Sequence, residues 1–181
     1  MTQTRIGSTR TETDSLGELA IPADALWGIQ TQRAVDNFPV SRWTMPRAFL
    51  RALGLLKASC AEANATLGAM PKARAKAIRV AASRVAKGEF DHAFPVDVFQ
   101  TGSGTSSNMN ANEVIARLAS QALGQTVHAN DDVNMAQSSN DVIPSCIQVA
   151  AVLECSERLR PALRHLRQTI ERRARELAKI A

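Results

Sequence analysis

The sequence is poor in aromatic residues and in cysteine, and each shortage narrows the classes of protein it can encode. It contains no tyrosine, two tryptophans, five phenylalanines and three cysteines among 181 residues. Cys60, Cys146 and Cys155 form an odd set without the spacing of a metal site, which is typical of a reducing compartment and excludes a disulfide scaffold. We therefore expect a cytoplasmic protein that binds no metal ion.

Long hydrophobic runs are also absent. No stretch approaches the roughly 18 consecutive apolar residues of a membrane span, and residues 1–16 lack the apolar segment of a secretory signal. The sequence therefore predicts no membrane association. With 45% apolar and 22% charged residues, the composition is that of a globular protein. The length corresponds to one domain, or to one domain with part of a second.

Positive charge is concentrated near the end of the chain. Lys and Arg total 22 against 17 Asp and Glu, a formal net charge of +5. The basic run comprises Arg158, Arg160, Arg164, Arg167, Arg172, Arg173, Arg175 and Lys179. Such a face can bind nucleic acid, but neither tryptophan lies near it to stack on bases. We interpret the run as a solvated helix face and expect no nucleic-acid partner.

The first half of the chain predicts an extended arm followed by helices. Residues 1–45 are rich in Thr, Pro, Gly and Asp, which favours an extended arm with one strand or hairpin. From Pro46 to Leu67 the apolar residues recur every three or four positions, which predicts an amphipathic helix. The residues on this face are Phe49, Leu50, Leu53, Leu56, Lys57 and Cys60. A second helix is predicted over residues 72–86, closed by Gly88.

The second half predicts a third helix and then a long one. The third covers residues 110–123, with polar loops at 88–106 and 126–139 on either side. The long helix begins at Asn140 or Asp141, either of which can cap it, and has Pro144 in its first turn. It continues to residue 180, and Pro161 is expected to kink it. Its narrow apolar seam is made by Leu159, Leu163, Leu166, Ile170, Ala174 and Leu177.

A long helix with such a seam needs partner helices to cover it. The rest of the chain offers few, so we expect a piece of a larger helical bundle. The predicted fold is mainly α. It consists of an N-terminal helical domain with a short extended arm over residues 1–139, and the start of an incomplete helical-bundle domain over residues 140–181.

The segment 101–110 (TGSGTSSNMN) is the first of two polar segments that lead into a predicted helix. Two glycines allow the backbone to approach a ligand closely, and the hydroxyls lie where a helix N-terminus favours an anion. A small carboxylate or phosphate fits such a site. The alternative is an ordinary Gly/Ser loop with a serine cap. The Gly-Lys-Ser/Thr ending of a phosphate-binding P-loop is missing.

The second polar segment is 128–141 (HANDDVNMAQSSND). Ser138, Ser139 and Asn140 are neutral donors at the start of the long helix, where they suit a second carboxylate or charge that develops on one. His128 with Asp131 is a candidate acid/base pair or metal site, although one histidine with two carboxylates is a weak metal pattern. The alternative for His128 is a structural role in the loop.

Together these segments resemble the fumarase/aspartase superfamily, and within it the class II fumarate hydratases. The resemblance covers nearly the whole chain, with several motifs in the same order. They are residues 14–18 (DSLGE), 22–28 (PADALWG), 30–34 (QTQRA), 37–39 (NFP), 100–116 (QTGSGTSSNMNANEVIA) and 128–141. The TGSGTSSN and QTQR stretches favour the hydratases over the aspartases.

The resemblance implies three groups of site residues. Ser103, Gly104 and Thr105 would contact a substrate carboxylate, and Ser138, Ser139 and Asn140 would do so from the second segment. A secondary dicarboxylate site, the B site, would contain His128, Ala129, Asn130 and Asp131. The family usually has proline where Ala129 stands, so this loop is expected to be less rigid here.

The implied reaction is the reversible addition of water to fumarate, giving (S)-malate, without a metal or organic cofactor. The family's serine base and its histidine lie beyond Ala181, so no catalytic residue is expected within the chain, and the chain alone is expected to be inactive. Members of the family are tetramers, which implies a homo-oligomer or a complementary lyase chain as partner. The alternatives are an aspartase-like ammonia lyase and a non-catalytic helical interaction module.

Overall fold

The computed structural model describes residues 8–178 and 180; residues 1–7 of the predicted arm, Lys179 of the predicted long helix and Ala181 lie outside this part. The described chain begins with a hairpin of β1 (Thr9–Asp14) and β2 (Gly17–Pro22). The strands are antiparallel, in a register that pairs Thr9 with Pro22 and Asp14 with Gly17. The predicted hairpin is therefore confirmed.

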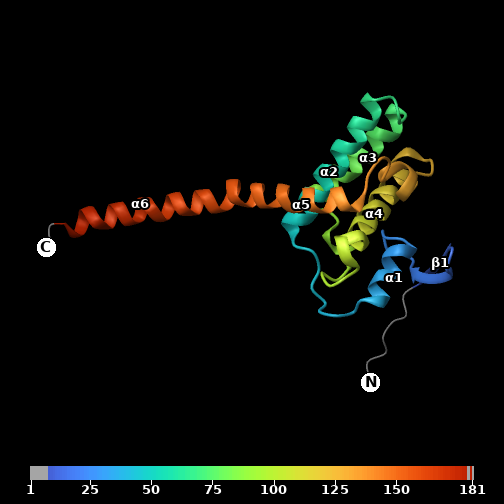
Figure 1. Ribbon diagram of the computed structural model, residues 1–181, viewed down its shortest axis with the longest axis horizontal. Helices are drawn as coiled ribbons and strands as arrows, with labels where there is room; N and C mark the ends of the chain where they lie inside the picture. Colours follow the sequence, from blue (N-terminus) through green and yellow to red (C-terminus); the bar gives the residue numbers. More distant parts are fainter. Residues whose placement is uncertain (1–7, 179, 181) are drawn as a thin grey trace, which may run out of the picture.

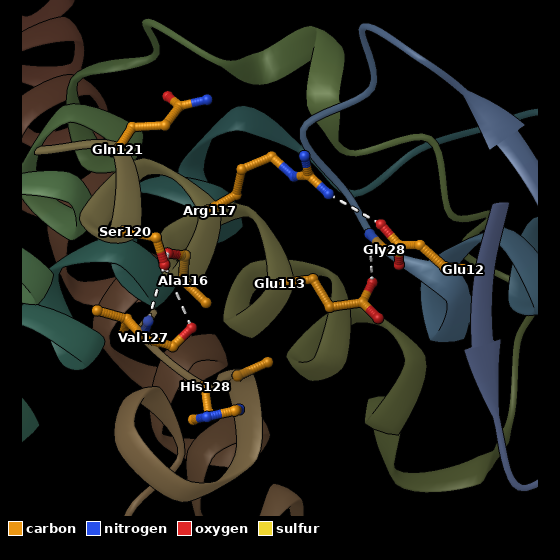
Figure 2. Close-up of a pocket in the computed structure, with 10 residues that line it drawn as sticks. Glu12, Gly28, Glu113, Ala116, Arg117, Ser120, Gln121, Val127 and His128 are labelled. Carbon is orange, nitrogen blue, oxygen red and sulfur yellow. Dashed lines mark hydrogen bonds and ion pairs between the residues drawn. The ribbon is translucent and has the colours of Figure 1, made fainter. Parts of the chain in front are cut away.

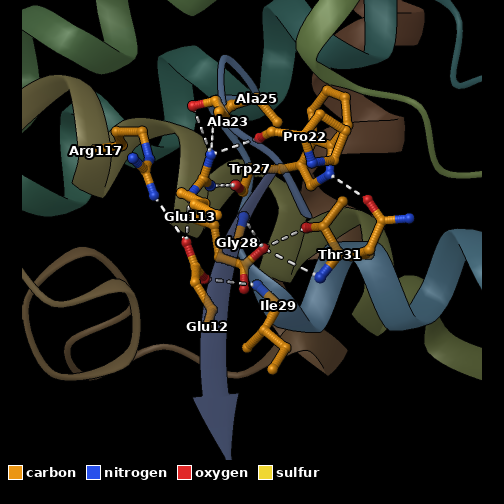
Figure 3. A network of polar contacts seen from close by, with 12 residues as sticks. Glu12, Pro22, Ala23, Ala25, Trp27, Gly28, Ile29, Thr31, Glu113 and Arg117 are labelled. Carbon is orange, nitrogen blue, oxygen red and sulfur yellow. Dashed lines mark hydrogen bonds and ion pairs between the residues drawn. The ribbon is translucent and has the colours of Figure 1, made fainter. Parts of the chain in front are cut away.

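Helix α1 (Ile29–Asn37) follows the hairpin, and the sequence analysis did not predict it. No side chain of its own first turn caps it. Instead, the carboxylate of Glu113 accepts hydrogen bonds from the backbone N–H groups of Gly28 and Thr31, at 2.9 and 3.1 Å (Figure 3), and from that of Gln30 at 3.0 Å. An anion at a helix N-terminus satisfies free N–H groups and favours the helix dipole. Since the cap comes from a helix about 80 residues later, α1 depends on tertiary structure.

Four helices enclose the core. They are α2 (Arg47–Thr66), α3 (Lys72–Lys87), α4 (Thr105–Leu123) and α5 (Ser139–Glu154). Buried Leu53, Ile78, Ile115 and Cys146 come from these four helices in turn and belong to one apolar cluster. Gly54 lets α2 and α3 pack closely, because a Cβ there would lie 2.7 Å from the carbonyl oxygen of Ala82. The predicted helices at 46–67 and 72–86 are confirmed.

The two predicted loops contain helical turns. Short 3₁₀ turns occupy Asp91–Ala93 and Gly102–Gly104, and α4 begins at Thr105, five residues before the predicted start. The early start is supported by Gln100, whose side-chain oxygen accepts from the backbone N–H of Ser107 at 2.8 Å. The second loop contains a π-helical turn over Ala129–Val133.

A long helical rod begins beside the other core helices and projects away from them over its C-terminal part (Figure 1). It consists of α5, a π-helical turn (Cys155–Leu159) and α6 (Arg160–Leu177). Pro161 lies two residues after the end of the π-helical turn, which widens the helix near the point where proline cannot donate a hydrogen bond. The rod continues in the same general direction through this point (Figure 1).

Two details of the long helix differ from the prediction. Its N-cap is Ser138, whose hydroxyl accepts from the backbone N–H of Asn140 at 3.2 Å, and not Asn140 or Asp141. Starting at Ser139, the helix has Pro144 at its sixth position, beyond the first turn. The earlier start follows from serine's short hydroxyl, which reaches the free N–H two residues ahead.

The apolar seam of the rod faces solvent. Its large residues are about half exposed, from 49% at Leu177 to 58% at Ile170. A bidentate ion pair between Arg51 and Glu157, at 2.6 and 2.9 Å, joins α2 to the π-helical turn in the middle of the rod. Within the described residues, no helix is both long enough and apolar enough to cross a membrane.

Candidate functional site

The N-terminus of α4 carries the first predicted group. Ser103 and Gly104 both have positive φ angles, 56° and 65°, and turn the chain into the helix at Thr105. Ser103 and Thr105 are exposed, and Gly104 is partly buried. The N-cap residue Gly104 has no side chain, so it provides no side-chain cap for the free N–H groups of this helix end, which favour an anion.

The second predicted group lies at the N-terminus of α5, close to the first. Ser138 caps α5, and Ser139 and Asn140 are its first two residues. A Cβ added to Gly104 would lie 3.1 Å from Cγ2 of Ile143, one turn into α5. The structure therefore brings two hydroxyl-bearing helix N-termini together. Their dipoles both favour negative charge at this place.

A buried polar network lies beneath these helix ends. Nζ of Lys57, from α2, donates to Oδ1 of Asn134 at 3.0 Å and to Oε1 of Gln137 at 2.9 Å. Nδ2 of Asn108, from α4, donates to the same Asn134 oxygen at 3.1 Å and to Oγ of Ser139 at 3.2 Å. Burial lowers the pKa of Lys57 to about 8.

The sequence analysis assigned no role to this network. Asn108 and Asn134 lie inside the two polar segments, but their side chains point into the protein rather than toward a ligand. A signal was available at Lys57, which falls on the apolar face of its helix. A lysine at a core position needs hydrogen-bond acceptors, because burying an unpartnered ammonium is costly.

The third predicted group lies along α4, in and before the π-helical turn. His128, Asn130 and Asp131 are exposed, and Ala129 is partly buried. The carboxylate that organises this turn is buried Asp132, which accepts from the backbone N–H of His128 at 2.8 Å and pairs with Arg74 at 2.9 Å. Among the hydrogen bonds of the described residues, none joins the side chains of His128 and Asp131. The candidate acid/base pair is thus not formed within this chain.

His128 and Ala129 line a cavity of about 410 Å³ together with Glu12, Glu113 and Arg117 (Figure 2). Arg117 donates to Glu12 at 2.8 Å across this cavity. None of the residues at the starts of α4 and α5 lines it. The structure therefore joins the first two groups and separates the third from them. Within the described chain, no three His, Cys, Asp or Glu side chains are gathered to hold a metal ion.

Comparison with known proteins identifies the family. Residues 17–181 match the family model for lyases. The chain belongs to the lyase family. It is 57% identical over 171 residues to the class II fumarate hydratase of Xylella fastidiosa, covering 94% of this chain and 36% of that protein. It is 60% identical over 169 residues to class II fumarate hydratase 2 of Pseudomonas aeruginosa, covering 93% and 37%.

The fold of this lyase chain is also similar to that of solved fumarase structures. The crystal structure of class II fumarase from Schistosoma mansoni matches it with a TM-score of 0.90 and 36% identity, over 93% of this chain and 37% of that one. The predicted resemblance to the class II fumarate hydratases and the predicted fold class are both confirmed. The lyase chain spans little more than a third of the length of these relatives.

Proposed function

We propose that this chain supplies the dicarboxylate-binding part of a class II fumarate hydratase, which adds water reversibly to fumarate to give (S)-malate. The observation that carries the proposal is the meeting of the α4 and α5 N-termini at Gly104 and Ile143. The two helix ends carry neutral donors on Ser103, Thr105, Ser138, Ser139 and Asn140. Fumarate carries two carboxylates, and two converging helix dipoles with hydroxyl and amide donors favour such a dianion.

The chemistry needs donors that act on charge as it develops. In the dehydration direction, a base removes the proton next to one carboxylate of malate, and negative charge moves onto that carboxylate. Donors already in place stabilise this carboxylate, which then carries two negative charges while the other carboxylate keeps its one, after which an acid helps hydroxide to leave as water. The residues of this chain would bind and orient the carboxylates. The proton-transfer groups would come from residues outside it, as the family resemblance implies.

We propose that His128, Ala129, Asn130 and Asp131 form a secondary dicarboxylate site. Their exposure on a turn that Asp132 and Arg74 hold in place supports this assignment. The site lies apart from the starts of α4 and α5 in this chain, which fits a role in substrate approach.

The partner proposed for this chain is a second lyase chain, either another copy of itself or a complementary one. The exposed apolar seam of α6 supports this, since apolar residues at helical spacing are covered in stable helical bundles. We also propose that the reaction takes place in the cytoplasm. All three cysteines lie in the described chain and are free thiols there, as a reducing compartment allows.

A hybrid enzyme tests the proposal. This chain is joined to the remainder of the Xylella relative, and loss of fumarate is followed by ultraviolet absorbance. We expect hydration by the hybrid and none by the 181-residue chain alone. Thr105→Ala and Asn140→Ala should each lower kcat about 100-fold, because each removes a donor to developing charge.

The control is Thr66→Ala, an exposed change at the end of α2, which should leave turnover as it was. Activity with ammonia in place of water would favour the aspartase-like alternative. Hydration by the chain alone would show that its own residues supply the proton transfers. A folded hybrid with no activity toward either nucleophile would contradict the proposal and favour a non-catalytic interaction module.

A further inference from the structure

Lys57 is a fully buried lysine for which the described structure shows no carboxylate partner. Its exposed fraction is 0%, and the titratable groups near it are the thiols of Cys60 on the same helix and Cys146 on α5. Burial lowers the pKa of Lys57 to about 8, raises the pKa of Cys146 to about 12 and also raises the pKa of Cys60, so both thiols are neutral at physiological pH. A buried amine in such surroundings destabilises the fold unless its hydrogen bonds are well made.

The two acceptors of Lys57 are side-chain amide oxygens that belong to one tight segment. Because both oxygens face Nζ, both amide nitrogens are directed to the backbone. Nδ2 of Asn134 donates to the carbonyl of Gln137 at 3.2 Å. Nε2 of Gln137 donates to the carbonyls of Val133 and Met135, at 2.9 and 3.3 Å. Lys57 therefore fixes the orientation of two amides that hold the segment 133–137 in shape.

The same contacts lead to both dicarboxylate-binding helix ends. Gln137 immediately precedes the α5 cap, Ser138. Asn134 shares its oxygen with Asn108, which also donates to Oγ of Ser139 and lies three residues after Thr105. A displacement of Asn134 or Gln137 would move the start of α5 relative to that of α4. An apolar side chain at position 57 would leave the side-chain oxygens of Asn134 and Gln137, both partly buried residues, without this donor.

We propose that Lys57 is a positioning residue for the dicarboxylate site, which sets the start of α5 against the start of α4 through Asn134 and Gln137. It does not reach the substrate in this arrangement, because it is fully buried beneath the site. Its effect on catalysis rests on the proposed function, whereas its effect on the geometry of the segment does not.

The geometric effect is tested by nuclear magnetic resonance on the 181-residue chain, without any substrate. We expect the Nζ resonance of Lys57 and the side-chain amide resonances of Asn134 and Gln137 to titrate with one shared midpoint. The backbone amides of residues 138–140 should follow with the same midpoint. In Lys57→Met this shared transition should disappear, and in Lys87→Met, which changes an exposed lysine of α3, it should persist.

The wild-type titration keeps the inference testable if Lys57→Met does not fold. The inference would be overturned if the amide resonances of Asn134, Gln137 and residues 138–140 did not change as Lys57 titrates. The inference would also be overturned if the backbone amides of residues 138–140 kept their wild-type pH dependence in the Lys57→Met chain.

The consequence for catalysis is tested in the hybrid enzyme. Lys57→Met should lower kcat/KM about tenfold or more, because small displacements of binding groups are costly, and should flatten the alkaline part of its pH profile. Lys87→Met should stay within about twofold of wild type. An unchanged profile in a folded Lys57→Met hybrid would overturn the catalytic consequence. If the wild-type hybrid hydrates no fumarate, the proposed function fails, and the titration still decides the role of Lys57.

Discussion

At the scale of single residues, Gly104 shows why a particular residue type is needed at the candidate site. Its φ of 65° is in the left-handed region, which side chains other than glycine rarely adopt. In addition, an added Cβ would lie 3.1–3.2 Å from three carbons of Ile143, which is itself buried. The effect of the left-handed backbone can be measured apart from the effect of the close contact with Ile143. A second glycine with a left-handed backbone, Gly124, has open space around it.

We predict that Gly104→Ala destabilises the chain more than Gly124→Ala. Both changes incur the left-handed cost of about 1–2 kcal/mol. Only Gly104→Ala also pushes against Ile143, which should add about 1 kcal/mol or more to the loss. Urea unfolding of both variants provides the measurement. Equal losses of unfolding free energy in the two variants would mean that the Ile143 side chain can move away from the new Cβ at no cost in free energy. The two helix ends would then not be tightly packed.

At the scale of elements, the hairpin and α1 are held to the helices by two carboxylates. Glu113 caps α1, and Glu12 accepts from the backbone N–H of Ile29 at 3.0 Å while pairing with Arg117 (Figure 3). Arg10 adds hydrogen bonds to the carbonyls of the segment between β2 and α1, including one to Trp27 at 2.6 Å. The N-terminal elements therefore depend on α4 for their position.

We predict that Glu113→Ala weakens the attachment of the hairpin and α1 to α4. It removes a charged acceptor shared by three backbone N–H groups, and we expect a loss of about 2 kcal/mol or more. Limited proteolysis should then cleave between β2 and α2 before the remaining helices. The matched control is Glu62→Ala, whose exposed pair with Arg79 contributes about 0–1 kcal/mol. Equal protease resistance in the two variants would contradict the capping role of Glu113.

At the scale of the whole molecule, the rod presents an uncovered apolar seam and a basic opposite face. Leu159, Leu163, Leu166 and Ile170 are all more than half exposed. The basic residues around them form ion pairs within the helix, such as that of Arg167 with Glu171. This supports the interpretation of the basic run as a solvated face and leaves the seam as the surface for a partner helix.

We predict that the chain self-associates through this seam. Leu166→Gln combined with Ile170→Gln should shift the chain toward monomer in sedimentation velocity, because it removes apolar area from the contact. Arg172→Gln combined with Arg175→Gln changes the opposite face of the helix, at 3.6 residues per turn, and should leave association unchanged. A wild-type chain that is monomeric at high concentration would instead favour a complementary lyase chain as the partner.

The sequence by itself determined the elements whose signals are local. Apolar spacing with glycine and proline at the ends predicted the helices now seen as α2 and α3, and the hairpin followed from composition and turns. The two polar segments were visible for a similar reason, as hydroxyls and glycines just before predicted helices, but their assignment to substrate binding came from the family resemblance and stays a prediction. Each of these features depends on residues close together in the chain.

Only the tertiary structure decided the features that depend on distant residues. Helix α1 needs the carboxylate of Glu113, which lies about 80 residues later in the chain. The meeting of Gly104 with Ile143 joins two site segments, and the contacts of Lys57 hold them in place. In each case a backbone group, a glycine or a buried amine finds its partner far along the chain, where no local pattern can specify it.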